Sequence, residues 1–152
     1  MLFRINDKKE EVLDYCIDKK NLYMGIILFD ELEKVYKLFS IEDSAIEKCK
    51  NIGELNYNTV FLNNNYLFGV ISLINSRNIF LKKDQFAFYI FKNIFLIIIL
   101  DDDDSHILSV FNNMYTHLDE SNITIAKIIY LFFNGLIIND YQYIERLQDD
   151  IE

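Results

Sequence analysis

Residues 122–152 read NITIAKIIYLFFNGLIINDYQYIERLQDDIE, without proline and with a single glycine. Apolar residues recur every three or four positions, which places them on one face of a continuous α-helix. They are Ile125, Ile128, Ile129, Phe132, Leu136, Ile144, Leu147 and Ile151. We expect Ser121 or Asn122 to cap the helix, because a short oxygen-bearing side chain accepts a bond from a free amide. At ~1.5 Å per residue the helix is roughly 45 Å long, so we expect it to project from the domain. No Gly or Pro ends the pattern before the last residue, so we expect the natural chain to continue.

The residues before this helix predict a hairpin and a shorter helix. Segments 85–91 and 94–100 are apolar runs of strand length around a turn at Lys92-Asn93. The second run, IFLIIIL, is rich in β-branched residues that suit a buried central strand. We expect a helix over 105–118, whose inner face consists of Ile107, Leu108, Phe111, Met114 and Leu118.

The first part of the chain alternates strands with helices. Four further strands are expected, at 1–5, 22–29, 56–63 and 66–74. Two helices are expected, at 31–39 with Asp30 as its cap and at 41–51 with Ser40 and Asp43 as a capping-box variant. The remaining segments are expected to be a turn or short helix over 7–18, a helix end at Gly53 and a polar loop over 75–84.

Together these elements predict an α/β fold class. We expect residues 1–152 to form one α-β-α layered domain, with a mixed β-sheet covered by helices and a long C-terminal helix.

Composition narrows the functional classes. The formal net charge of −9 repels phosphate backbones, so we expect no nucleic-acid partner. Cys16 and Cys49 form no CxxC or Cys/His cluster, and we interpret both as reduced, half-buried thiols. No secretory signal is visible, and both apolar stretches, 86–100 and 123–138, are interrupted before the ~20 residues that cross a bilayer. The chain in hand is therefore expected to be soluble.

Catalytic motifs are absent from the sequence. There is no nucleophile elbow, P-loop, dinucleotide fingerprint or HExxH pattern, so we expect no catalytic residues and no enzyme activity. His106 and His117 lie eleven positions apart on one predicted helix, ~16 Å along its axis, which is too far to share a metal ion. We interpret them as surface histidines.

Four consecutive carboxylates form the candidate metal site, Asp101, Asp102, Asp103 and Asp104. They follow a predicted strand and precede a helix, and they offer the hard oxygen ligands that Mg²⁺ and Ca²⁺ prefer. The simpler interpretation, which we favour, is helix capping and solvation at the positive end of the helix. The acidic tail, 140–152, has two similar interpretations: a solvated helix face, or a low-affinity divalent site shared with a neighbouring subunit.

The segment from Lys83 to Glu152 carries a family resemblance. Residues 83–104 read KDQFAFYIFKNIFLIIILDDDD, and they match a KxxFxF strand followed by a run of the LIII kind. In the long helix, the pattern FLxxxLxxxIxxDxxxIExLExxIExLE is matched by Phe132, Leu136, Asn139-Asp140, Ile144-Glu145, Leu147 and Ile151-Glu152. These motifs resemble the end of the cytosolic domain in CorA-like divalent-cation transporters, in a divergent bacterial branch.

The resemblance implies the cytosolic regulatory domain of a magnesium or divalent-cation transporter, which regulates or gates ion transport. In that family five identical subunits assemble, and C-terminal spans place the domain on the cytoplasmic face of the inner or plasma membrane. Those spans and the family's Gly-Met-Asn signature are missing from this sequence. The chain is therefore expected to be either a fragment or a gene product that has lost its pore. The resemblance implies that its partners are copies of itself, divalent cations and, through the missing spans, the membrane.

The resemblance also bears on cofactors and on competing functions. No cofactor is expected to bind tightly, and Mg²⁺ or another divalent cation is expected to bind at low affinity. Asp101–Asp104 are candidates for that cation by chemistry alone. The alternative function is a stand-alone cytosolic interaction or adaptor protein that uses its projecting C-terminal helix.

Overall fold

The computed structural model describes residues 1–5, 9–52, 58–63, 65–73, 83–118 and 121–151, and it places side chains up to residue 138. The elements in chain order are β1 (Leu2–Ile5), β2 (Lys9–Glu11), β3 (Tyr23–Leu28), α1 (Phe29–Val35), the 3-10 helix η1 (Tyr36–Phe39), α2 (Asp43–Lys50), β4 (Thr59–Leu62), β5 (Leu67–Leu73), β6 (Asp84–Phe91), β7 (Ile94–Asp101), α3 (His106–His117) and α4 (Ile125–Ile151). The expected helix end at Gly53 and most of the expected loop at 75–84 lie outside the described residues.

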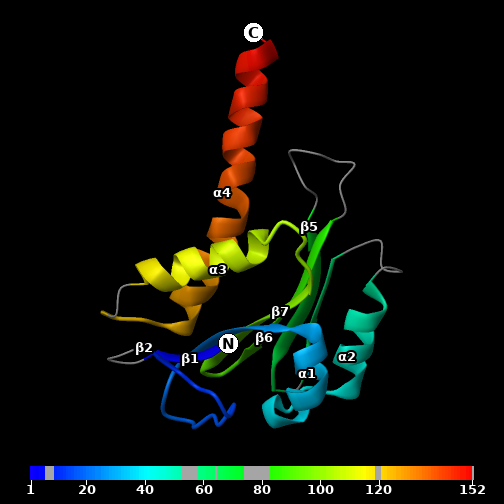
Figure 1. Cartoon of the computed structure of the whole chain (residues 1–152), viewed down its shortest axis with the longest axis vertical. Helices are drawn as coiled ribbons and strands as arrows, with labels where there is room; N and C mark the ends of the chain where they lie inside the picture. The colour runs from blue at the N-terminus through cyan, green and yellow to red at the C-terminus, as the bar shows by residue number, and fades with distance from the viewer. Residues whose placement is uncertain (6–8, 53–57, 64, 74–82, 119–120, 152) are drawn as a thin grey trace.

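The strands form one mixed sheet in the order β2-β1-β3-β7-β6-β5-β4. Strands β3 and β7 pair in parallel at its centre, and the other neighbouring pairs are antiparallel. The predicted hairpin is β6–β7, and its turn falls at Lys92-Asn93 as expected, with Lys92 in a left-handed conformation. Figure 1 shows α1 and α2 against one face of the sheet and α3 and α4 against the other.

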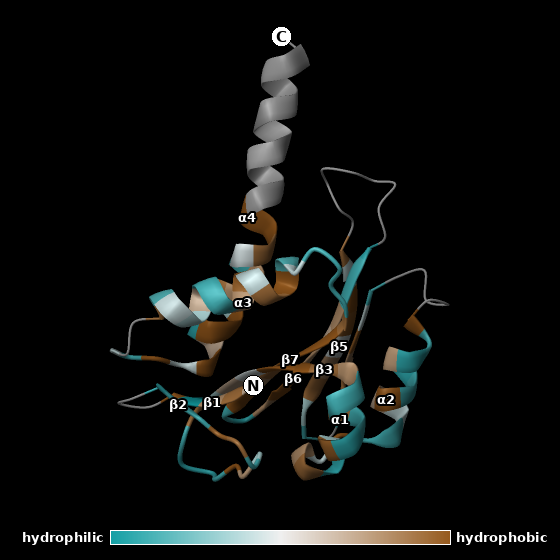
Figure 2. Ribbon diagram, in the orientation of Figure 1, coloured by the Kyte–Doolittle hydropathy of each residue, from teal (hydrophilic) through white to brown (hydrophobic). Residues whose placement is uncertain are grey.

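Alternation along the central strands creates a separate core on each face. On β3, Tyr23 and Ile27 face the side covered by α1 and α2, whereas Met24 and Ile26 face α3 and α4. Strand β7 alternates in the same way, and both faces are buried because a parallel pair at the centre of a sheet has helices on both sides. The α-β-α layering expected from the sequence is confirmed, and Figure 2 shows apolar residues concentrated on the sheet and the helix faces toward it.

Helix α4 is anchored to the sheet by aromatic packing. The ring of Phe132, which is fully buried, lies 5.8 Å from the ring of Phe86 and 5.7 Å from that of Phe95, both edge to face. One turn later, Gly135 lets α3 approach closely: a Cβ there would lie 2.8 Å from Cγ1 of Val110. The first half of α4 is thus fixed, and its second half rises away from the domain (Figure 1). In the part of the chain that is described, no helix is long and apolar enough to cross a membrane.

Helix starts differ from the sequence predictions. Thr124 Oγ1, and not Ser121 or Asn122, accepts from the backbone N–H of Lys127 at 3.2 Å and caps α4. Thr124 was overlooked because the polar pair before it is an equally good capping sequence. The expected cap of α1 is also wrong. Asp30 lies inside the first turn of α1, whose N-cap position is Leu28.

The expected capping box is also wrong. Ser40 has a left-handed backbone (φ 56°) and ends the 3-10 helix, so α2 begins only at Asp43. Strand β2 was not predicted, because a turn or short helix was expected at these residues. Its short polar sequence, KEE, has no apolar alternation, and Glu10 reaches Arg4 of β1 in an exposed ion pair.

We expect Phe132→Ala to lower the free energy of unfolding by about 3–5 kcal/mol, because it opens a cavity among buried aromatic rings. Urea denaturation measures the change. The control is Tyr130→Ala on the same helix, since this side chain is 64% exposed and its loss costs little. Equal losses in the two variants would contradict the anchoring role of Phe132.

Candidate functional site

Acidic residues collect at one edge of the sheet. The parallel pairing of β3 with β7 brings the carboxyl ends of both strands to this edge, where Leu28 lies opposite Ile99. Strand β6 runs the other way, so its first residue, Asp84, starts here as well. In open α/β sheets ligands bind outside the carboxyl ends of parallel strands, so this edge is the first place to look for a site.

A hollow of about 400 Å³ lies at this edge. Its lining includes Phe29 and Asp30 from the start of α1, and Asp101, Asp102 and Asp103 from the end of β7 and the turn after it. Asp101 and Asp102 are half-buried, whereas Asp103 and Asp104 are exposed. The chain therefore places several carboxylates around one small depression.

Asp102 is committed to the start of α3. One carboxylate oxygen accepts from the N–H of Ile107 and the other from the N–H of Leu108, both at 3.0 Å. Its carbonyl oxygen also accepts from the N–H of Ser105, whose left-handed backbone (φ 54°) makes the turn into the helix. This is the capping role that the sequence favoured, and it is carried by one of the four acids.

The metal-binding role of Asp101, Asp102, Asp103 and Asp104 stays a prediction. Within the described residues, no group of three or more His, Cys, Asp or Glu side chains is arranged to hold a metal ion. The acids of the tail, 140–152, lie in α4 beyond the described side chains, so their proposed shared site also stays a prediction.

Asp84 belongs to the same acidic edge and was missed from the sequence. Burial raises the pKa of its carboxyl, and the charge of Asp102 raises it further, with smaller contributions from Asp104 and Asp101. His106 acts in the opposite direction. The signal was present, because a two-residue turn at Lys92-Asn93 fixes a register that brings Asp84 close to Asp101.

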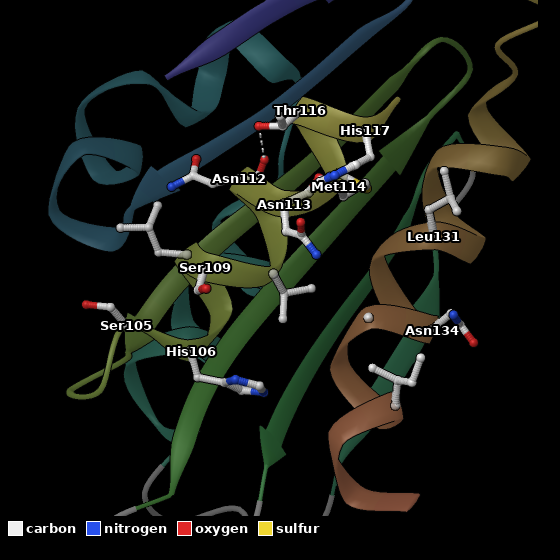
Figure 3. A pocket seen from close by; sticks show the side chains of 14 residues that line it. Ser105, His106, Ser109, Asn112, Asn113, Met114, Thr116, His117, Leu131 and Asn134 are labelled. Atoms are coloured by element: carbon white, nitrogen blue, oxygen red, sulfur yellow. Dashed lines mark hydrogen bonds between the residues drawn. The ribbon is translucent and has the colours of Figure 1, made fainter. Parts of the chain in front are cut away.

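A second concavity lies between α3 and α4, with a volume of about 910 Å³. Both histidines line it, and Figure 3 shows His106 near one end of α3 and His117 at the other. His117 is exposed, with Nδ1 2.9 Å from the carbonyl oxygen of Asn113, and His106 is half-buried. They occupy opposite ends of one groove, which we call the α3–α4 groove.

The cysteines are both free, and neither is half-buried as expected. Cys16 is exposed, and Cys49 belongs to α2 and is buried in the core. Burial raises the pKa of the Cys49 thiol to about 12, because the thiolate would lose its hydration. Cys49 is thus an unreactive core residue.

Comparisons with known proteins give matches in structure and none in sequence. The sequence matches no protein-family model and no curated protein sequence. The structure is similar to that of the soluble domain of CorA from Methanocaldococcus jannaschii, with a TM-score of 0.66 and 15% identity over 99% of this chain and 61% of that one. It is also similar to the complete CorA magnesium transporter of the same organism, with a TM-score of 0.65 and 12% identity over 99% of this chain and 48% of that one.

These matches establish that the chain has the fold of the CorA soluble domain. The chain spans 61% of the length of that domain chain and about half of the complete transporter.

We expect Asp102→Ala to lower the free energy of unfolding by about 1 kcal/mol, because two amide groups at the start of α3 lose their acceptor. Asp103→Ala removes a neighbouring, exposed carboxylate and should change stability by less than about 0.5 kcal/mol. Urea denaturation of both variants is the measurement. A larger loss in Asp103→Ala would show that the cap is assigned to the wrong residue.

The raised pKa of Asp84 predicts a pH dependence. Between the unfolded-state pKa, about 3.9, and the higher folded value, the folded chain binds more protons, so stability falls as the pH rises through this window. Asp84→Asn removes the penalty and should raise the melting temperature at pH 7 but not near pH 3, where both states are protonated. The control is Glu11→Gln, which removes an exposed carboxylate from β2, the first strand in the sheet order. A gain that persists at low pH would refute the electrostatic cause.

Proposed function

We propose that this chain is the cytosolic domain of a CorA-like magnesium or divalent-cation transporter, where it regulates or gates ion transport. The observation that carries the proposal is the match of 99% of the chain to the soluble domain of CorA. The sequence motifs add support from a separate source, since the strand pair and long-helix pattern over 83–152 resemble the same family.

The proposed role is a binding and gating module without chemistry of its own. Copies of a chain with a net charge of −9 repel one another in a ring, and bound divalent cations would reduce that repulsion. Cations that bind one packed state better than the other shift the population toward it, which is how such a domain would report the ion concentration. In the full-length protein, the membrane spans would follow α4, and five copies would assemble.

The acidic edge is the proposed place where the cation acts. Asp84, Asp101, Asp103 and Asp104 lie there, and the pKa of Asp84 is raised first by burial and then by the charges of Asp102, Asp104 and Asp101. A divalent cation would relieve the repulsion, and the oxygen ligands suit Mg²⁺. Asp102 is already bound to the start of α3 and would contribute mainly by its charge.

The second candidate function is a stand-alone interaction protein. The projection of α4 beyond the sheet favours it, because an amphipathic helix is a common ligand for a hydrophobic groove (Figure 1). This function needs neither an ion response nor a membrane.

A thermal melt with and without several millimolar MgCl₂, at matched ionic strength with NaCl, tests the proposed ion response. We expect a Mg²⁺-specific rise of about 2–4 °C for a site that is several-fold saturated, and its loss in Asp103→Asn/Asp104→Asn. This pair is preferred to Asp102, whose replacement would also remove the cap. A rise of equal size in the double variant would place the cation elsewhere, and no rise beyond the salt control would contradict an ion sensor at this edge.

A further inference from the structure

Strand β4 lies at one edge of the sheet, and in the described part of the chain no strand pairs with its outer side. Beyond its end, the N–H of Asn63 donates to the carbonyl oxygen of Tyr66 at 2.9 Å. Bonded and non-bonded residue pairs alternate along an antiparallel ladder. The backbone groups of Phe61 therefore face β5, whereas those of Val60 and Leu62 face outward. The outer edge offers the N–H and the carbonyl oxygen of both residues.

The side chains on one face of this edge are apolar and exposed. Val60 is 55% exposed and Leu62 is 81% exposed. Phe61, between them, packs against the core on the side of α1 and α2, so its two neighbours point to the other face of the sheet. Two apolar side chains thus stand in solvent beside the outward backbone groups.

The opposite edge of the sheet is built differently. Strand β2 has only three residues, Lys9, Glu10 and Glu11, and all of them are charged. A short, charged strand discourages pairing with another chain. Residues 58–63, which contain β4, read NTVFLN and carry no charge. An apolar edge without such protection is a template for the addition of a further strand.

A cation lies over the other face of this edge. The Nζ atom of Lys48, on α2, lies 3.5 Å from the centre of the Phe61 ring. Among the described side chains Lys48 forms no ion pair, whereas Lys50 on the same helix binds Glu33 at 2.9 Å. A cation–π contact leaves the ammonium charge uncompensated. A carboxylate placed beside Phe61 would therefore find a charged hydrogen-bond donor.

We propose that β4 binds an extended segment of another protein, which adds a strand to the sheet. The added strand is antiparallel, like the pairs from β4 to β7, because antiparallel pairing is the more stable kind. Its residues opposite Val60 and Leu62 are apolar. The residue between them, opposite Phe61, is Asp or Glu and pairs with Lys48. The partner thus carries an apolar–acidic–apolar motif.

The net charge of the chain makes this preference distinctive. A charge of −9 attracts basic ligands and repels acidic ones at long range. A preference for a carboxylate must therefore come from a local cation, and Lys48 is the one that this edge provides. The proposal does not rest on the transporter function, since it follows from the edge of the sheet alone.

Binding of the fluorescein-labelled peptide STVEVTS, measured by fluorescence polarisation, is the first test. We expect saturable binding with a Kd below about 1 mM. The peptide STVKVTS should bind at least about tenfold more weakly, although the net charge of the chain favours it. Lys48→Glu should reverse this preference, because it places the opposite charge over Phe61.

A matched pair of variants tests the backbone of β4. Val60→Pro removes the outward N–H and should weaken the binding of STVEVTS at least about tenfold, whereas the ladder to β5 does not use this group. Val60→Ala keeps the N–H and should bind almost as well as the native chain. Circular dichroism checks that both variants are folded.

Backbone methylation of the peptide tests the same geometry without changing the protein. In the proposed antiparallel pair, both valines of the peptide turn their N–H groups toward β4 and the glutamate turns its N–H away. Methylation of either valine nitrogen should weaken binding at least about tenfold. Methylation of the glutamate nitrogen should leave it nearly unchanged.

Four results would overturn the proposal. The first is no saturable binding of STVEVTS up to about 1 mM. The second is binding that ignores methylation of the valines, because a helix or a non-specific apolar ligand would then cover Val60 and Leu62. The third is a preference of the native chain for STVKVTS. The fourth is self-association of the chain, seen by sedimentation velocity, that Val60→Pro abolishes, because a second copy would then occupy the edge.

Discussion

The parallel pairing of β3 with β7 is the interaction on which the rest of the structure depends. Six consecutive residues of β3, Tyr23 to Leu28, lie opposite Ile94 to Ile99 of β7. Both strands are apolar on both faces, so neither face can be left in water, and helices must cover each of them. The pairing therefore dictates the three layers, the two separate cores, and the long crossover that carries α1, α2 and the strands β4 to β6 between the paired strands.

The same pairing explains where the candidate sites lie. Parallel strands end at one edge, and the antiparallel β6 starts there, so Asp84 and the acids after β7 gather without any need for a long-range loop. Asp102 then fixes the direction of α3 by accepting from two amides at its start. Because α3 crosses α4 at Gly135, the α3–α4 groove opens on the outer side of that crossing. The acidic edge and the α3–α4 groove are thus two consequences of one chain path.

The sequence predicted the fold better than the site. The hairpin β6–β7 was predictable because two apolar runs of strand length, the second rich in β-branched residues, flank a two-residue turn. Helix α4 was predictable because its apolar period extends over many turns. Helix starts were not predictable, because short polar residues stand at several positions before each helix. Before α4, Ser121 and Asn122 are as good capping residues as Thr124 on sequence alone. Before α2, Ser40 has a capping side chain but ends the 3-10 helix instead. Strand β2 was missed because an edge strand of three polar residues carries no periodic signal. Asp84 was missed because its importance comes from the pairing with β7, and the groove because it is formed by the crossing of two helices.

We propose that this fold serves a transporter of divalent cations, with the domain held at a membrane by spans that follow α4. The most direct measurement is an immunoblot of the source cells with an antibody raised against this chain, after carbonate-washed membranes have been separated from the supernatant. If the proposed function is correct, a band appears in the membrane pellet at a mass well above the 18.2 kDa of this chain. A band at 18.2 kDa in the supernatant would contradict the transporter function and favour the interaction protein.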